Sequence, residues 1–74
     1  MKEKVLALLQ DVMPGIDFES SNTLADDGVI DSLSVVNIIA EISMEFGITV
    51  PFEEIKNENF NSIDAIAALV EKLS

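Results

Sequence analysis

Apolar residues recur along the chain at the three- and four-residue spacing that places them on one face of an α-helix. The pattern is clear in three stretches and predicts helices over residues 2–13, 32–46 and 62–73. The Pro-Gly pair at 14–15 ends the first stretch, and Gly47 provides a natural stop for the second. These helices predict an all-α fold.

The connections between the helices differ in length. Residues 14–30 form a long loop of turn-forming residues, whose apolar side chains we expect to fold down over the helices. The run 48–50 is compatible with a brief extended piece, and Pro51 predicts a short helix that continues to about Lys56. The whole pattern predicts a small four-helix bundle with three main helices, one short helix and a long first loop, in a single domain over residues 1–74.

The predicted helix over 32–46 has two apolar faces, whereas a helix in so thin a bundle needs only one. At about 100° per residue, one set of side chains forms a core stripe, and a second set forms an outer stripe centred about 140° away. An exposed apolar strip usually marks a partner or ligand surface, and the alternative is that its first residues pack beneath the long loop. The core stripe comprises Val35, Ile38, Ile39, Ile42 and Phe46, and the outer stripe comprises Leu33, Val36, Ala40 and Met44.

Asp31 and Ser32 stand at the start of this helix, and both are residue types that cap a helix N-terminus, as are Asn61 and Ser62 before the last helix. A serine hydroxyl at such a place lies beside unpaired backbone N–H groups and the positive end of the helix dipole, which favours an attached phosphate. Asp31 would repel that phosphate, so we expect Asp31 to serve instead in a contact with a metal ion or an enzyme. Position and residue type alone favour the simpler interpretation, in which Ser32 is only a helix cap.

The composition excludes several classes of function. The chain has 14 acidic residues, 4 lysines, a net charge of −10, and neither cysteine nor histidine. Without those two residue types the usual proton shuttles, zinc ligands and nucleophile–histidine pairs are missing, so neither an enzyme nor a metal site is expected. The run Asp26-Asp27-Gly28 lacks the remaining ligands of a calcium loop.

The same composition limits partners and location. The negative charge disfavours nucleic acids and anionic membranes, and no apolar run is long enough to be a signal peptide or a membrane span. A chain that is 49% hydrophobic is also too apolar to be a disordered acidic tail. We therefore expect a folded acidic monomer in the cytoplasm.

The run Val29-Ile30-Asp31-Ser32-Leu33 resembles the phosphopantetheine attachment motif of acyl carrier proteins. The likeness extends to the chain length, the acidity, the aromatic end of the second helix and the entry to the short third helix, and it covers nearly the whole chain. The Asp-Ser-Leu tripeptide is weakly specific by itself, but at this place in this architecture it is strongly specific. The resemblance implies a four-helix bundle without catalytic activity, to which a phosphopantetheinyl transferase attaches the 4′-phosphopantetheine of coenzyme A through Ser32.

The resemblance also implies roles for neighbouring residues. In that family the arm ends in a thiol that carries acyl groups as thioesters and presents them to one enzyme after another. Asp31 would assist the transferase or its metal ion, and the outer stripe would dock partners. Those partners would be the transferase and acyl- or aminoacyl-loading and transfer enzymes whose basic patches are attracted to an acidic surface. The predicted partner surface comprises Leu33, Val36, Ala40, Glu41 and Met44.

The cargo stays open at this point. Fatty-acid carriers have more acidic residues on the second helix, where this chain has Asn37, Ser43 and Met44. The segment 51–62 is more similar to D-alanyl carrier proteins and to stand-alone carriers of specialised pathways, and the Gly-Gly pair favoured by modular peptidyl carriers is missing before Ser32. A hydrophobic cavity between the helices would favour a fatty cargo, and a fully packed core a small one. Three functions remain: an acyl carrier of fatty or specialised lipid biosynthesis, a D-alanyl or other aminoacyl (peptidyl) carrier, and an unmodified acidic helical module that binds a partner through the outer stripe.

Overall fold

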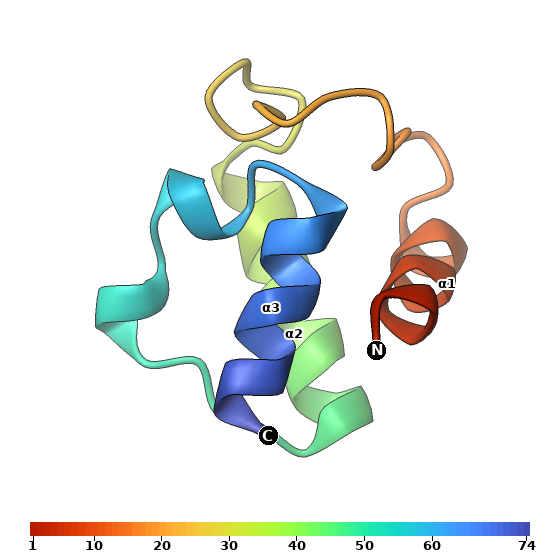
Figure 1. Cartoon of the computed structure of the whole chain (residues 1–74). Helices are drawn as coiled ribbons and strands as arrows, with labels where there is room; N and C mark the ends of the chain where they lie inside the picture. Colours follow the sequence, from red (N-terminus) through yellow and green to blue (C-terminus); the bar gives the residue numbers. More distant parts are fainter.

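The computed structural model describes all 74 residues and contains three α-helices, two short 3-10 turns and no strand. Helix α1 spans Lys2–Val12, α2 spans Ser32–Phe46 and α3 spans Ile63–Leu73, while the turns η1 and η2 span Phe52–Glu54 and Asn57–Asn59. Figure 1 shows the long first loop crossing one end of the three helices. The all-α prediction is confirmed, and the main helices lie within one residue of their predicted bounds.

Local chemistry determines where α2 and α3 begin and where α2 ends. The Asp31 carboxylate accepts the Ser34 N–H at 2.9 Å and caps α2. The Ser62 hydroxyl accepts the Ala65 N–H at 3.0 Å and caps α3. Gly47 ends α2 with φ 65°, a left-handed conformation that glycine adopts without the steric cost of a Cβ atom.

A cluster of 15 buried residues forms the core and draws on all three helices and on the long loop. Of the core stripe on α2, only Ile38 and Ile42 are fully buried, and the other three side chains are half-buried against them. Helix α1 contacts both α2 and α3, so the three helices share this core. The buried residues from α1 and α3 are Val5, Leu9, Ile63, Ile66, Ala67, Leu69 and Val70.

The long loop contains neither helix nor strand, yet its apolar residues attach it to the bundle. Phe18, Leu24 and Ile30 are buried in the core, which confirms that the loop folds down over the helices. The Leu24 N–H also donates to the Asn61 carbonyl at 2.9 Å. Val29 is the exception, with 48% of its surface exposed. The residues just before α2 are therefore held against the start of α3.

The short helix expected from Pro51 to about Lys56 is shorter in the structure, where it is the single 3-10 turn η1, followed by η2. The reason lies in the carbonyl of Glu54. It accepts the Asn59 side-chain amide at 2.7 Å and the Lys56 N–H at 3.1 Å, instead of the N–H four residues later in the chain. Asparagine side chains compete with helical hydrogen bonds in this way, and 3-10 helices stay short.

Candidate functional site

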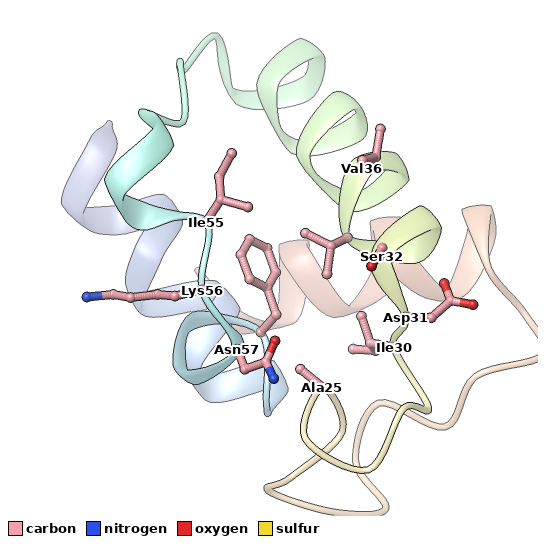
Figure 2. A pocket seen from close by; sticks show the side chains of 10 residues that line it. Ala25, Ile30, Asp31, Ser32, Val36, Ile55, Lys56 and Asn57 are labelled. Atoms are coloured by element: carbon pink, nitrogen blue, oxygen red, sulfur yellow. The ribbon is translucent and has the colours of Figure 1, made fainter.

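Ser32 is the first residue of α2, and it lines an open groove shown in Figure 2. Its side chain is exposed, and its hydroxyl makes no hydrogen bond within the protein. The interpretation in which Ser32 is only a helix cap is wrong, because Asp31 supplies the cap. The Ser32 hydroxyl can therefore react without removing an interaction that holds α2 in place.

Asp31 has a distinct electrostatic setting. Hydrogen bonding, first of all from the Ser34 N–H, holds the pKa of Asp31 below its ordinary value of 3.8, because it stabilises the ionised carboxylate. The carboxylate therefore occupies the anion position at the positive end of the α2 dipole. A phosphate on Ser32 would have to lie outside that position, since the Ser34 N–H is already taken. The helix start thus favours a phosphate less than the sequence pattern suggests.

The groove beside Ser32 has a volume of about 510 Å³ and opens to solvent. Figure 2 shows Val36 on α2 and Ile55 on the segment after η1 on opposite sides of it, with Ala25 and Asn57 at the other end. The other hollow of the surface lies between α1 and the end of α2 and is also open. No enclosed cavity lies between the helices.

The outer stripe of α2 is exposed along its length. Leu33, Val36 and Met44 are 75%, 61% and 73% exposed, and Ala40 is also exposed. Glu41 is half-buried. The alternative in which Leu33 and Val36 pack beneath the long loop is therefore wrong. The five residues of the predicted partner surface all lie on α2, and their role as a docking surface stays a prediction.

The groove includes residues that the sequence did not single out. Ile55, Asn57 and Phe60 line it from the segment around η2, whereas Ser32 lines it from α2. Nothing in their spacing relates them to the start of α2, because tertiary packing alone brings the two regions together. Phe52, an apolar residue in the short polar turn η1, is a weak sequence signal that this segment has a function. It does not line the groove, and it is 87% exposed.

Two acidic side chains of the long loop accept hydrogen bonds from other side chains. Asp27 accepts the Thr23 hydroxyl at 2.7 Å, and Asp26 accepts the side-chain amides of Asn57 and Asn61. No group of three or more acidic, histidine or cysteine residues is placed to hold a metal ion. None of the helices combines the length and the apolar character that crossing a bilayer requires.

Comparison with known families decides the class of protein. The family described as phosphopantetheine attachment site matches residues 3–70, which include Ser32 and the lining of the groove. The chain belongs to the phosphopantetheine-binding carrier family. It is therefore a carrier protein with a covalent 4′-phosphopantetheine and has no catalytic activity of its own. The Ser32 hydroxyl is exposed beside an open groove and is therefore accessible from solvent.

Curated relatives match the carrier over almost its full length. It is 32% identical over 74 residues to a D-alanyl carrier protein from Streptococcus suis (strain 05ZYH33), and the match covers 99% of this chain and 94% of the relative. It is 36% identical over 73 residues to a D-alanyl carrier protein from Streptococcus equi subsp. zooepidemicus (strain MGCS10565), with 97% and 92% covered. A D-alanyl carrier protein from Lactococcus lactis subsp. lactis (strain IL1403) is 28% identical over 74 residues, with 97% and 94% covered. No solved structure gave a significant match.

Proposed function

We propose that the carrier is one domain over residues 1–74 that bears 4′-phosphopantetheine on Ser32 and carries D-alanine or another small aminoacyl group as a thioester. The observation that carries this proposal is the near full-length similarity to proteins named D-alanyl carrier protein. It favours the aminoacyl cargo over the fatty acyl cargo. Membership of the phosphopantetheine-binding family argues against the unmodified interaction module.

The geometry of Ser32 supports its role as the attachment site. In the transfer, a bond forms between the Ser32 Oγ and the phosphorus that bears pantetheine, and the bond from that phosphorus to the bridging oxygen of the coenzyme A diphosphate breaks. The 3′,5′-adenosine bisphosphate leaves with that oxygen, and the hydroxyl proton passes to a base of the transferase. The hydroxyl is exposed and unbonded at the start of α2, so it is accessible to that enzyme. The Asp31 carboxylate lines the same groove, and we propose that it contacts the transferase or its metal ion. Because coenzyme A is the donor, we place the modification in the cytoplasm.

The packing of the bundle supports a small cargo. Each apolar Å² that stays in water costs about 25 cal/mol, so a long acyl chain gains from an enclosed cavity, whereas a small group needs none. The core of this bundle is filled by side chains, and its hollows are open. An aminoacyl group also carries an amine, whose protonated form is attracted by a protein with a net charge of −10.

The outer stripe and the acidic charge support transient docking. Opposite charges speed the encounter with a partner that has a basic patch, and a small apolar contact then determines the fit. A carrier must leave each enzyme again, so its interface is expected to be small. We propose that the transferase and the aminoacyl-loading enzyme both dock on the residues of the outer stripe together with Glu41.

The test has two stages and uses intact-mass measurement. The protein is incubated with coenzyme A, magnesium and a broad-specificity phosphopantetheinyl transferase, with Ser32→Ala and Ser34→Ala beside it. We expect one phosphopantetheine on the wild type and on Ser34→Ala, and none on Ser32→Ala. Ser34 is a matched control, because it is the nearest serine and its N–H, which caps α2 with Asp31, is kept.

The second stage identifies the cargo. The modified protein is incubated with ATP, a D-alanine-activating enzyme and D-alanine, or with an acyl-activating enzyme and a long-chain fatty acid. A mass gain of one alanyl group that hydroxylamine removes is expected. Modification of Ser32→Ala in the first stage would exclude Ser32, and loading with the fatty acid but not with D-alanine would return the cargo to the fatty acyl class.

A further inference from the structure

One wall of the groove is attached to the rest of the protein mainly by polar contacts. Residues 49–59, the strap, include Ile55 and other lining residues, yet none of their side chains is fully buried. The buried side chains of Ile48 and Phe60 anchor the two ends of the strap. Between these anchors, Val50 packs half-buried against the core. From η1 onward, the strap is held to the rest of the protein by side-chain hydrogen bonds and an ion pair.

One of these contacts lies at the end of the groove and bridges three segments. The Asp26 carboxylate accepts the Asn57 side-chain amide at 3.2 Å through one oxygen and the Asn61 side-chain amide at 3.1 Å through the other. The Asn61 side-chain oxygen in turn accepts the N–H groups of Ala25 and Asp26 at 3.0 and 2.9 Å. Asp26 thereby joins the strap to the loop before α2 and to the start of α3. Figure 2 shows Asn57 and Ala25 at the same end of the groove.

A second polar contact holds the other part of the strap. The Glu54 carboxylate accepts hydrogen bonds from the Lys72 ammonium of α3 and from the Asn59 side-chain amide. The ammonium, first of all, and the amide hold the pKa of Glu54 below its ordinary value of 4.5. This contact fixes η1 against the end of α3, so release of the Asn57–Asp26 bond would free the groove end of the strap while η1 stays attached.

We propose that Asp26 is a positioning residue whose bond to Asn57 holds the strap beside Ser32 and so sets the width of the groove. The inference rests on the proposed function to the extent that the groove shelters the arm on Ser32. The contact is exposed, and a single hydrogen bond of this kind shifts an equilibrium by roughly 2- to 10-fold. The strap therefore opens more readily than the core unfolds, and the groove widens when it does.

The hydrogen bond between Asn57 and Asp26, here called the latch, is tested by amide hydrogen exchange in the unmodified protein. Asp26→Ala and Asn57→Ala each remove the bond between the loop and the strap. Asp27→Ala is the matched control, because it removes the same charge from the next residue, whose carboxylate binds only Thr23 of the same loop. The double variant Asp26→Ala/Asn57→Ala shows whether the two residues act through one contact.

The informative amides are those of Asn59 and Phe60, which donate within the strap and its anchor to Lys56 and Asn57 at 3.0 and 2.9 Å. We expect these two amides to exchange roughly 2- to 10-fold faster in Asp26→Ala and in Asn57→Ala than in the wild type. The double variant should exchange no faster than Asp26→Ala, and Asp27→Ala should exchange as the wild type does. Amides of α1 should exchange as in the wild type in Asn57→Ala. Equal strap exchange in Asp26→Ala and the control, or a uniform increase over the whole chain in Asn57→Ala, would overturn the proposal.

The modified protein links the latch to the arm. Attachment of the arm should shift the methyl NMR signal of Ile55 in the wild type and in Asp27→Ala, and less in Asp26→Ala. An equal shift in all three would overturn the connection between the latch and the arm. If Ser32 does not accept the arm, the proposed function fails, and the exchange rates of the unmodified protein decide on the latch separately.

Discussion

The two faces of α2 consist of similar side chains and have opposite surroundings. Ile42 is fully buried, whereas Met44, two residues later, is 73% exposed. Apolar character alone therefore does not predict burial in this helix. The angle of a side chain around the helix axis, relative to α1 and α3, decides whether it stabilises the fold or remains available for contact.

The small size of the protein explains why one face of α2 is buried and the other is exposed. A chain of 74 residues has a thin core, so one stripe of α2 is enough to complete it. Side chains on the second stripe find no other element to pack against. Scattered exposed apolar residues are ordinary, but here they follow one face that begins next to Ser32, which is why we propose that they dock partners.

The largest effect should come from the inner face. Ile42→Ala removes buried methyl groups and leaves a cavity, so we expect the free energy of unfolding to fall by about 2–5 kcal/mol. Small domains have only about 5–15 kcal/mol in total, so the variant should be close to unfolding at 37 °C. Urea denaturation followed by circular dichroism measures the change. A loss no larger than that of Met44→Ala would contradict the assignment of the inner face.

An intermediate effect is expected where the two faces begin. Asp31→Ala removes the cap of α2, so the melting temperature should fall at neutral pH, and Asp31→Asn, which keeps an acceptor for the Ser34 N–H, should lose less. The folded pKa of Asp31 lies below 3.8, so its stabilisation is fully present above that pH and is lost as the pH falls through the folded pKa. The melting-temperature gap between the wild type and Asp31→Ala should therefore close in acid. A gap that is constant down to the lowest pH would show that the charge of the cap does not matter.

The same two variants separate the two roles of Asp31. If the carboxylate also serves the transferase, Asp31→Asn should be modified more slowly although its fold is kept. The measurement is the initial rate of mass gain with coenzyme A and magnesium. Equal rates for Asp31→Asn and the wild type would restrict Asp31 to capping.

The smallest effect on stability is expected on the outer face. Met44→Ala and Leu33→Ala should change the free energy of unfolding by less than about 0.5 kcal/mol, because both side chains are largely in water already. Both should weaken the binding of the transferase or the loading enzyme, as measured by titration calorimetry. A large fall in melting temperature for Met44→Ala would end the distinction between the two faces. Added salt should slow the association of the wild type, since the attraction between opposite charges is screened.

Much of the fold follows from local rules. The helical period, the capping residues and Gly47 place the three main helices within one residue of their observed bounds. The segment around η1 departs from the prediction because the Asn59 side chain, from a later turn, takes the Glu54 carbonyl. That competition depends on a three-dimensional arrangement that propensity along the chain does not contain.

Part of the candidate site can likewise be predicted from the sequence, and part of it cannot. Asp31, Ser32 and the outer stripe are neighbours along one helix, so their pattern is visible in the sequence and carries the family resemblance. Which of Asp31 and Ser32 caps the helix was not visible, because both residue types form caps. The structure assigns the cap to Asp31 and leaves the Ser32 hydroxyl unbonded.

The sequence by itself determined the helices, the acidic charge and the serine at the start of α2, because each depends on residues close together in the chain. Only the tertiary structure decided that the outer stripe faces water, that Ile55 and Asn57 come to lie beside Ser32, and that the Asn57 side chain donates a hydrogen bond to Asp26. Those contacts join segments that are 20 or more residues apart in the chain. They form because the shared core brings the helices together, and the hydrogen bonds between the segments can form only after that packing has occurred.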